Sequence, residues 1–390
     1  MRTAKLKDIT LTITDGKHGD CKNHDDSGYY FISCKDVYDE TIHYENARQI
    51  TEDDFRDADR RTNLAAYDIL ITNSGTIGRM ALVKDIPETR KTTFQKSVAI
   101  VRADTSQVVP NYLYYLLKSK VHDFINSSNG SAQKNLLLST MRDFDISFVD
   151  SFETQHRIAT ILSRYDSLIE NYQKQIKLLE EAAQRLYKEW FVDLRFPGHE
   201  NTKIIDGVPE GWEKKKVADV VVFYDKMRKP LSSMQRQSME KIYPYYGAAS
   251  LMDYVDNYLF DGTYLLMGED GTVISNEKYP MLQYVWGKFW VSNHAHVLQG
   301  KEPYSTEFIY MMLKQMTILD VVTGAAQPKI SQGRLAAKEI IMPANELVKE
   351  YDKIVVPMIQ QAKSLQSQIR LLTEARDRLL PKLMSGEITV

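Results

Sequence analysis

The sequence QIKLLEEAAQRLYKEW, Gln175–Trp190, returns 193 residues later as QIRLLTEARDRLLPKL, Gln368–Leu383. Around both copies, side chains recur at alternating steps of four and three residues, which is the pattern of a coiled-coil seam. The first seam consists of Ile158, Leu162, Tyr165, Ile169, Tyr172, Ile176, Leu179, Ala183, Leu186 and Trp190. The second, with one charged interruption, consists of Tyr351, Val355, Met358, Ala362, Leu365, Ile369, Leu372, Arg376, Leu379 and Leu383. Each helix needs a long partner, so the sequence predicts that the two pair with each other, antiparallel.

Three further matches show that the repeat extends beyond the helices. YDILITNSGTIG, Tyr67–Gly78, aligns with FDGTYLLMGEDG, Phe260–Gly271. NYLYYLLKS from Asn111 aligns with EFIYMMLKQ from Glu307, and GSAQKN from Gly130 aligns with GAAQPK from Gly324. Because the matches occur in the same order, the chain is interpreted as a tandem duplication of domain, helix, domain, helix.

The predicted fold class is therefore α+β. Two mixed α/β domains, joined by two long antiparallel coiled-coil helices, form an internal repeat with pseudo-two-fold symmetry. The predicted boundaries are a first domain at 1–150, a spacer helix at 151–195, a second domain at 196–345 with a linker at 196–210, and a second helix and tail at 346–390. Strands are expected at Tyr29–Ser33, Asp68–Thr72, Ser97–Arg102 and Val220–Phe223, and a helix at Pro110–Ser119.

Local signals predict where the long helices begin and end. Asp150 followed by Glu153 predicts a capping box at the start of the first helix, which is carried to about Val192. In the second helix, Pro357 is expected to produce a kink or mark the effective start, and Pro381 to end the helix shortly before Gly386.

Composition places limits on the kind of protein. The formal net charge is −2, so any nucleic-acid surface must be local rather than global. Two cysteines make no disulfide framework, and no apolar run reaches the ~20 residues that span a bilayer. The segment Met1–Thr10 carries no apolar run of the kind found in secretory signals. These features predict a soluble, cytoplasmic protein.

A duplicated layout suits a ligand that carries two sites at a fixed distance, such as duplex DNA, which repeats about every ~34 Å. The two globular segments share their layout but differ in almost every exposed side chain. The sequence therefore favours a scaffold that reads two different half-sites.

Five stretches carry a resemblance to a known family. They are Asp15-Gly16-Lys17-His18, Gly75-Thr76-Ile77-Gly78, Phe152-Glu153-Thr154-Gln155 before Arg157-Ile158, Pro209-Glu210-Gly211-Trp212, and the ending Leu380-Pro381-Lys382-Leu383-Met384-Ser385-Gly386-Glu387-Ile388. Together, over essentially its whole length, the chain resembles the specificity subunit of a type I restriction-modification system. The resemblance implies two target recognition domains, each reading half of a split, asymmetric DNA sequence. The paired helices would set the spacer length and bind two methyltransferase subunits.

The resemblance also assigns the chemistry to other chains. Methyltransferase partners would bind S-adenosylmethionine and methylate adenine N6, and restriction subunits would use ATP and Mg. The sequence itself contains no Asn-Pro-Pro-Tyr or Asp-Pro-Pro-Tyr stretch and no G-x-x-x-x-G-K-[ST] phosphate loop. The chain is therefore expected to be non-catalytic and to bind no cofactor itself.

Candidate DNA contacts come from basic and polar residues near turns. In the first domain they are Lys17, His18, Thr76 and Arg79; in the second they are Lys226, Arg228, Lys229, Arg236, Tyr245, Tyr246, Gln283 and His294. The alternatives are that these residues lie in plain hairpin turns or on a solvated charged face. The patch Lys214–Lys216 is interpreted either as a solvated patch or as a phosphate contact. The turn Gly268-Glu269-Asp270-Gly271 is acidic, so it either accepts from a cytosine amino group or does not touch DNA.

His18, Cys21, His24 and Cys34 have a spacing that resembles a zinc site. Asp20, Asp25 and Asp26 crowd the same segment, and no Cys-x-x-Cys is present. An exposed recognition loop is preferred to a metal site, with an ordinary surface loop as the alternative.

Two other classes of function compete. One is a fragment or variant of a self-contained endonuclease or methyltransferase, which the missing catalytic motifs disfavour. The other is a coiled-coil interaction protein with two protein-binding heads, which the near-neutral charge permits. A salt-dependent affinity for DNA would argue against the second.

Overall fold

The structure is a computed structural model that describes residues 1–128, 135–275, 278–324 and 327–390. Its contacts divide the chain into two compact units: unit 1 comprises Met1–Asn171 and Ile369–Val390, and unit 2 comprises Tyr172–Gln368. Each long helix contributes one half to each unit, whereas the sequence boundaries treat the helices as separate segments; those boundaries stay a prediction. Most of the GSAQKN stretch and part of GAAQPK lie outside the described residues.

Unit 1 is a mixed domain whose first and last strands pair. Strand β1 (Arg2–Lys5) runs antiparallel to β10 (Asp145–Phe148), which brings the two ends of the domain together. The other elements are η1 (Leu6–Ile9), β2 (Thr10–Asp15), β3 (Tyr30–Ile32), β4 (Val37–Tyr38), β5 (Thr41–Ile42), α1 (Glu52–Thr62), β6 (Ile69–Thr72), β7 (Met80–Leu82), η2 (Pro87–Lys91), β8 (Thr92–Phe94), β9 (Val98–Ala103), α2 (Pro110–Ser119), α3 (Val121–Asn126) and α4 (Leu138–Arg142).

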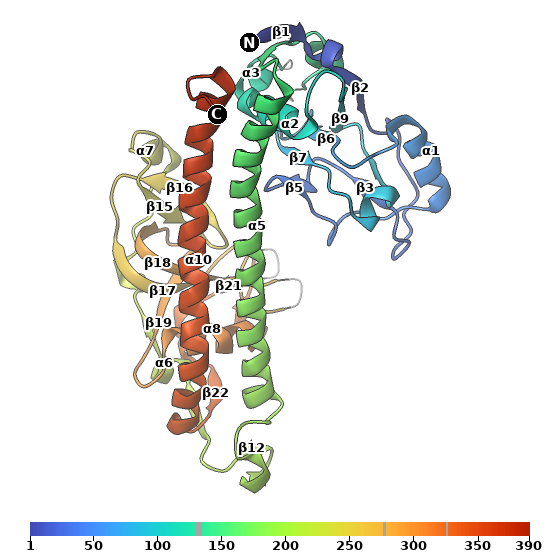
Figure 1. Ribbon diagram of the computed structural model, residues 1–390. Coiled ribbons are helices and arrows are strands. Elements are labelled where there is room, and N and C mark those ends of the chain that lie inside the picture. The colour runs from blue at the N-terminus through green and yellow to red at the C-terminus, as the bar shows by residue number, and fades with distance from the viewer. Residues whose placement is uncertain (129–134, 276–277, 325–326) are drawn as a thin grey trace. The chain divides into compact units, whose positions relative to one another are not determined.

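The central sheet of unit 1 has the order β2-β9-β6-β7 and is antiparallel throughout (Figure 1). Strand alternation explains its two cores. Ile69 and Ile71 pack in the cluster that contains helix α2, whereas Leu70 packs in a second cluster on the other face. Helix α2 begins with Pro110 in its first turn, as predicted, and covers the first face.

Unit 2 contains the second domain. Its elements are a π-helical turn (Lys188–Val192), η4 (His199–Asn201), β11 (Ile204–Ile205), β12 (Val208–Pro209), β13 (Glu213–Lys216), α6 (Val217–Val220), β14 (Val221–Phe223), η5 (Asp225–Met227), α7 (Ser233–Gln237), β15 (Tyr243–Tyr246), β16 (Leu251–Val255), β17 (Phe260–Gly268), β18 (Leu282–Val291), β19 (Ala295–Gly300), α8 (Thr306–Gln315), β20 (Val322–Thr323), β21 (Lys329–Ile330), α9 (Gln332–Ala337) and β22 (Glu339–Met342). Its main sheet has the order β14-β19-β17-β18-β15-β16.

The predicted tandem repeat is confirmed by the strand order. Strands β14-β19-β17-β18 repeat β2-β9-β6-β7, and the pair β13–β22 repeats β1–β10. Helix α8 lies against β19 and β18 as α2 lies against the equivalent strands β9 and β7. Strand β15 joins the sheet through a parallel pairing with β18, as β3 pairs in parallel with β8 in unit 1, and β16 pairs antiparallel with β15.

The long helices are α5 (Phe152–Tyr187) and α10 (Asn345–Ser385). In unit 1, Asp166 of α5 pairs with Arg376 of α10, and Val390, which follows α10, lies near Arg157. A later residue of α10 thus lies beside an earlier residue of α5, so the two halves run antiparallel there.

Two expectations about the helix ends are corrected. Ser151, not Asp150, caps α5, because its hydroxyl accepts from the Thr154 amide at 3.3 Å. Helix α10 continues through Pro357 and Pro381. Both prolines are exposed, so the carbonyls that lose a hydrogen-bond partner face water, and flanking core residues keep the helix in place. The helix ends before Gly386, whose φ of 77° is left-handed.

Within the described ranges, no helix is long and apolar enough to cross a membrane.

A buried acid on α10 predicts a pH dependence of stability. Burial raises the pKa of Asp352 to about 6, and the carboxylate accepts a hydrogen bond from Ser305 Oγ at 2.8 Å. A raised pKa in the folded state means that stability is greatest below the unfolded pKa and falls as the pH rises through about 6. We expect Asp352→Asn to be more stable than the wild type at pH 8 by about 1–2 kcal/mol, with little difference at pH 4. Thermal unfolding at both pH values, with the exposed Asp256→Asn as control, checks this; equal midpoints at pH 8 would contradict it.

Candidate nucleic-acid interface

Three loops of unit 1 meet at one end of its sheet: the loop after β2, the loop after β6 and the loop before β9. The Lys17 amide donates to Phe94 O at 2.7 Å, and the Asn73 amide donates to Ser97 O at 3.1 Å. A Cβ on Gly16 would lie 2.0 Å from Phe94 O, so only glycine allows this approach. The loops therefore form one continuous edge.

At this edge, Lys17 and His18 are held by acidic neighbours. Lys17 Nζ lies 3.1 Å from Asp57 Oδ2, and this hydrogen bond raises the pKa of Lys17. The His18 ring lies 3.1 Å from the carboxylate of Asp15, which is buried at the end of β2 and also receives Arg61 Nη2 at 2.5 Å. Lys17 and His18 thus organise the edge, and His18 still exposes 58% of its side chain.

Thr76 and Arg79 lie in the glycine turn after β6, and both are exposed. Thr72 fixes the turn, because its hydroxyl donates to the Thr76 carbonyl and accepts from the Arg79 amide at 2.9 Å. The Arg79 side chain makes no ion pair with another described residue. It is therefore free to meet a phosphate.

Sequence reasoning missed two lysines at the same edge, Lys35 and Lys96. Both are exposed, and neither makes an ion pair within the described part of the chain. The Lys96 amide donates to Lys17 O at 3.1 Å, and the residue before Lys35, Cys34, donates its amide to Ser97 Oγ at 3.1 Å. No local pattern marks these lysines, since separate loops carry them to one place.

Unit 2 forms the equivalent edge from the ends of β14 and β17 and the start of β19. Lys226 and Lys229 are exposed there, whereas Arg228 is held by ion pairs and hydrogen bonds and exposes 13% of its side chain. Its guanidinium lies 2.6 Å from Glu269 Oε2 and donates to Ala295 O at 2.8 Å. Arg228 therefore holds the edge together, and its assignment as a phosphate contact stays a prediction.

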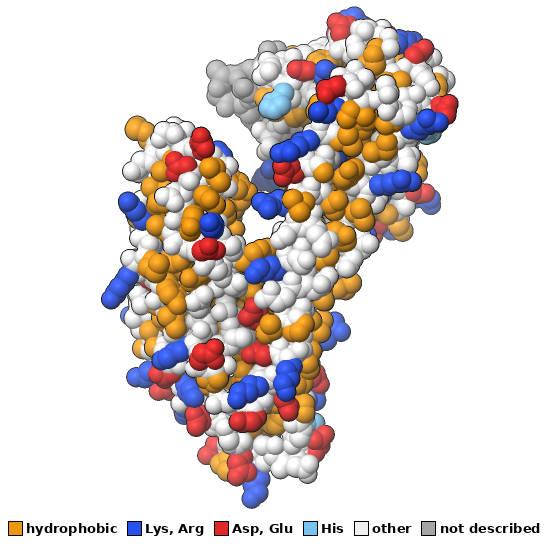
Figure 2. Space-filling view, turned by 60° about the vertical axis from the view of Figure 1, so that its left-hand side comes forward, with side chains coloured by type: hydrophobic (Ala, Val, Ile, Leu, Met, Phe, Trp, Pro, Cys, Tyr) orange, Lys and Arg blue, Asp and Glu red, His pale blue; other side chains and the backbone are white. Residues whose placement is uncertain are grey.

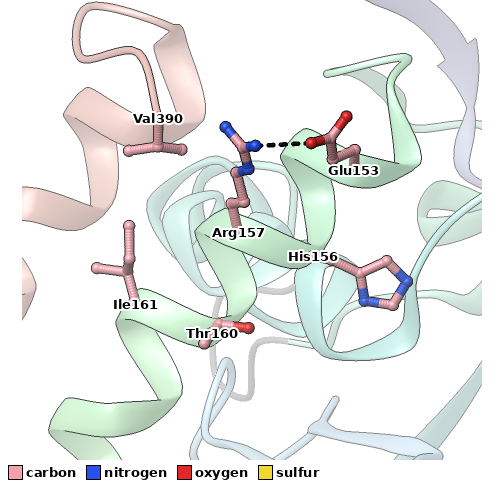
Figure 3. Close-up of a pocket in the computed structure, with 6 residues that line it drawn as sticks. All are labelled: Glu153, His156, Arg157, Thr160, Ile161 and Val390. Atoms are coloured by element: carbon pink, nitrogen blue, oxygen red, sulfur yellow. Dashed lines mark hydrogen bonds and ion pairs between the residues drawn. The ribbon is translucent and has the colours of Figure 1, made fainter.

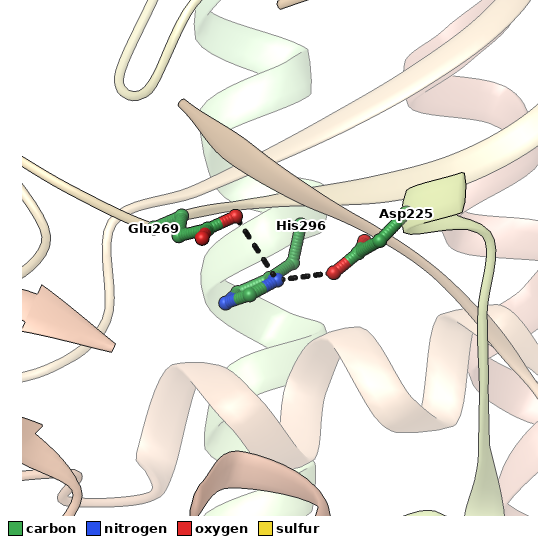
Figure 4. Close-up of side chains that lie close together, drawn as sticks. All are labelled: Asp225, Glu269 and His296. Carbon is green, nitrogen blue, oxygen red and sulfur yellow. Dashed lines mark hydrogen bonds and ion pairs between the residues drawn. The ribbon is translucent and has the colours of Figure 1, made fainter. Parts of the chain in front are cut away.

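Glu269 in the acidic turn is part of a buried charge network with Asp225 and His296 (Figure 4). His296 Nδ1 lies 2.6 Å from Asp225 Oδ2 and 3.7 Å from Glu269 Oε2, and its Nε2 lies 2.9 Å from Ile330 O. Three such groups are a possible metal set, but both imidazole nitrogens are engaged and the Arg228 guanidinium already neutralises the acids. The cluster is a structural network. Glu269 is therefore engaged by Arg228 within the network, and the two alternatives for this turn stay predictions.

Arg236 and Tyr245 are engaged within unit 2, and their assignment as DNA contacts stays a prediction. Arg236 exposes 13% of its side chain, lies 3.2 Å from Asp253 and donates to Leu231 O at 2.6 Å. Tyr245 is buried, and its hydroxyl accepts from the Leu231 amide at 3.1 Å. Both residues fold the β15–β16 hairpin, so the structure gives them packing roles.

The remaining predicted residues of the second domain lie beside the edge. His294 exposes 51% of its side chain and lies 2.6 Å from Asp270 Oδ1. Gln283 donates to Gly247 O at 3.1 Å, and Tyr246 is partly buried against Phe289. His294 is thus the most accessible of the three.

The zinc-like set is not brought together as a ligand group. Cys21 is buried in an apolar cluster with Phe31, and His18 is bound to Asp15. Among the described residues, the metal-compatible group is the one around His296.

The predicted helix seams are covered along their length. Ile158, Leu162 and Leu365 are buried; Tyr165, Ile169, Tyr172, Ile176, Leu179, Leu186, Ile369, Leu372 and Leu379 are partly buried. In unit 1, Ile158 and Leu162 share a core with Leu380 and Leu383, and in unit 2 the Tyr351 hydroxyl donates to Ala183 O at 3.0 Å. Their role as a partner interface stays a prediction.

A pocket of about 440 Å³ lies in unit 1 and is lined by Glu153, His156, Arg157, Thr160, Ile161 and Val390 (Figure 3). Arg157 is held by Glu153 at 2.6 Å, and His156 points away from Val390. The lining residues offer no nucleophile paired with a base, so the pocket gives no reason to assign a reaction.

Basic and acidic side chains are intermixed on the surface that Figure 2 shows, rather than forming one basic field. With a net charge of −2, attraction to a polyanion must come from local edges such as Lys35, Arg79 and Lys96. The fold and these edges define a class: a tandem-repeat protein with exposed basic side chains at one edge of each repeat.

Comparison with known proteins identifies the family. Residues 2–181 and 209–369 match the family described as the type I restriction modification DNA specificity domain. The MjaIX specificity subunit of Methanocaldococcus jannaschii is 29% identical over 346 residues, which cover 83% of this chain and 78% of that protein. A putative type I specificity subunit of Haemophilus influenzae is 34% identical over 153 residues, 39% of this chain and 38% of that protein. The S subunit of a type I system from M. genitalium has the same fold, with a TM-score of 0.59 and 18% identity over 98% of this chain and 96% of that one.

The chain belongs to the family of type I restriction-modification DNA specificity subunits. It carries two specificity domains, and its function is to recognise a bipartite DNA target within a multi-subunit system rather than to catalyse a reaction. The family assignment favours DNA recognition over a coiled-coil interaction protein.

Proposed function

We propose that the edge of each unit described above contacts one half of the asymmetric target, with the helix pair setting the spacer between the halves. The observation that carries this is the equivalence of the two edges. The edge of unit 1 lies at the loops that follow β2 and β6, and the edge of unit 2 lies at the loops that follow the equivalent strands β14 and β17. Their exposed side chains differ, Lys35, Arg79 and Lys96 in unit 1 and Lys226, Lys229 and His294 in unit 2. One scaffold with two sets of side chains suits two different half-sites.

Phosphate contacts at these edges predict a measurable salt effect. We expect Arg79→Ala combined with Lys96→Ala to weaken DNA binding by the assembled complex about equally for all sequences. The slope of log affinity against log salt should fall by about two, roughly one for each lost contact. Fluorescence anisotropy at several salt concentrations measures the slope. Arg56→Ala is the control, because Arg56 is exposed but is held by Glu52 at 2.6 Å; an unchanged slope would remove both residues from the interface.

The helices offer a second, duplicated surface. The two copies share their seam residues, which packing explains, but they also share exposed ones. Leu178, Glu181, Ala182 and Arg185 on α5 recur as Leu371, Glu374, Ala375 and Arg378 on α10, and all eight are exposed. We call each set of four a repeated face. Its spacing of three and four residues places the set on one side of its helix. Packing within the chain does not require this identity, so a shared external contact explains it better.

The repeated faces support two copies of one partner, which we take to be the methyltransferase subunit. Leu178 and Leu371 are 63% and 57% exposed, enough to enter an apolar groove, and the small Ala182 and Ala375 allow a partner helix to approach. In this proposal the methyltransferase subunits bind S-adenosylmethionine and methylate adenine N6. Restriction subunits with ATP and Mg join the complex, and this chain binds no cofactor.

Affinity capture of the tagged chain from its host tests the proposal. Recovery of an adenine methyltransferase at two copies per chain, followed by mapping of a bipartite methylated sequence, is the expected result. Capture without a methyltransferase would contradict it.

A further inference from the structure

A buried arginine interrupts the apolar seam of α10 in unit 1. Arg376 is 5% exposed, and three acids surround it. Its guanidinium lies 2.5 Å from Asp166 Oδ1, 2.9 Å from Glu40 Oε1 and 2.9 Å from Asp377 Oδ1. These acids come from α5, from the turn between β4 and β5, and from α10 itself. One side chain thus joins the first domain to both long helices.

The network continues into the domain through helix α2. Lys118 Nζ lies 2.5 Å from Glu40 Oε1, and the Tyr114 hydroxyl donates to Glu40 Oε2 at 3.3 Å. The Tyr115 hydroxyl donates to Asp166. The first domain is therefore fastened to the helices by directional bonds to charged groups.

The charges in this network compensate one another. Burial opposes ionisation of Glu40, but Lys118 and Arg376 outweigh it and lower the pKa of Glu40. Burial likewise opposes the charge on Arg376, and Glu40 and Asp166 outweigh it and raise the pKa of Arg376. A buried ion network of this kind seldom stabilises a protein more than apolar side chains of similar volume would. Stability alone does not account for it.

The backbone strain of the turn that carries Glu40 also indicates a role beyond stability. Asp39 and Glu40 have φ values of 46° and 62°, both left-handed. Two-residue hairpin turns with this geometry favour glycine at the second position, so a glutamate there is less favourable. The Glu40 side chain contributes contacts that glycine would not, which offsets the strain.

Unit 2 shows that the repeat folds without these charges. At the offset of 193 residues, Arg376 corresponds to Ala183 and Asp166 corresponds to Ile359. Both counterparts are buried in the apolar core of unit 2. The same position in the helix pair is therefore filled by apolar side chains in one unit and by an ion pair in the other.

We propose that Arg376 is a positioning residue that fixes the first recognition domain in one orientation on its helices and so restricts the spacer length that the complex accepts. Apolar contacts tolerate small shifts, whereas bonds from one guanidinium to three acids hold a single geometry. This inference rests on the proposed function, since the spacer has meaning only if each unit reads a half-site.

The test transplants the pair of unit 2 into unit 1 as Asp166→Ile with Arg376→Ala, in the complex with its methyltransferase. Methylation is measured on duplexes with unchanged half-sites and spacers that differ by one base pair. We expect the preference for the best spacer over its neighbours to fall roughly tenfold, or about 1.4 kcal/mol. A ratio is used because lower stability or weaker assembly reduces methylation at all spacers alike. The control is Glu153→Ala with Arg157→Ala, an exposed ion pair on α5 with a distance of 2.6 Å.

A second measurement does not depend on DNA. Spin labels at the exposed Arg90 and Lys382, both in unit 1, report the distance between the domain and α10 in the free chain, with Cys34 changed to Ser. We expect a narrow distribution in the parent and a broader one in the transplanted variant. If that variant does not fold, the same distance measurement is made on Arg376→Lys. We expect a broader distribution there too, because one ammonium group cannot bind all three acids.

The outcomes separate the two proposals. Unchanged spacer preference and unchanged label distances in a folded variant would overturn the role of Arg376. A parent complex that methylates no bipartite site would overturn the proposed function instead, and the label distances would still decide the inference.

Discussion

Replacing Leu178 with Arg in the full chain is expected to leave one methyltransferase subunit bound where the wild type binds two. Leu371→Arg should do the same, and the double variant should bind none. The reason is that each leucine is the apolar centre of one repeated face, and an arginine placed in an apolar groove leaves a charge without a partner. Native mass spectrometry of the assembled complex counts the partner copies directly.

Leu168→Arg is the matched control. Leu168 is also an exposed leucine of α5, at 42%, but its counterpart at the same offset is Gln361, so it is not part of a repeated face. We expect it to retain both partner copies. Equal losses for Leu168 and Leu178 would show that the leucines act through general solubility, and two copies retained by the Leu178 and Leu371 variants would place the docking surface elsewhere.

The seam shows how much of the fold the sequence contains. Apolar residues at steps of four and three, repeated after 193 residues, were enough to predict α5 and α10, and the matches outside the helices added the tandem order. The predictions that Pro357 marks the effective start of the helix and that Pro381 ends it were wrong, because the local cost of proline was weighed without the packing that surrounds it. Pro381 lies between Leu380 and Leu383, which are buried in the core of unit 1 and keep the helix continuous.

The candidate site was harder to predict, because its ion pairs join residues far apart in the sequence. Lys226, Arg228, Lys229 and Arg236 look alike as a basic stretch, but only the fold brings Glu269 to Arg228. Conversely, Lys35 and Lys96 are isolated in the sequence and meet only when their loops converge. A sequence pattern reports local periodicity, whereas contacts across the fold determine whether a charged side chain is ion-paired within the protein or exposed.

The same reasoning applies to Arg376. In the seam it was an interruption, since a charge at a packing position is unfavourable by itself. In the structure, Asp166 of α5 and Glu40 of a hairpin turn form ion pairs with Arg376, so the charged residue links the first domain to the helices. The periodicity located the position correctly, but only the fold shows why a charge is tolerated there.

Exchange of residues 210–343 for the equivalent segment of another family member is expected to change one half of the methylated sequence and leave the other half intact. The segment is suited to exchange because its ends lie on paired strands: β13 runs antiparallel to β22, with Glu213 opposite Met342. The edge formed by β14, β17 and β19 lies wholly within it. Since each mismatched base pair costs about 1–3 kcal/mol, two changed positions should reduce methylation of the original half-site by roughly 10²-fold or more.

Sequencing of methylated genomic DNA from cells that express each chain gives both half-sites at once. The control is the same exchange applied to residues 1–150, which should change the opposite half. Because the exchange of 210–343 leaves α5, α10 and the network around Arg376 in place, the spacer length should stay the same in that hybrid; the exchange of 1–150 replaces Glu40 and is read only for its half-site. A hybrid that alters both halves would contradict independent reading by the two units. A new spacer in the 210–343 hybrid would show that the second domain, rather than the helices and the network around Arg376, determines the separation of the half-sites.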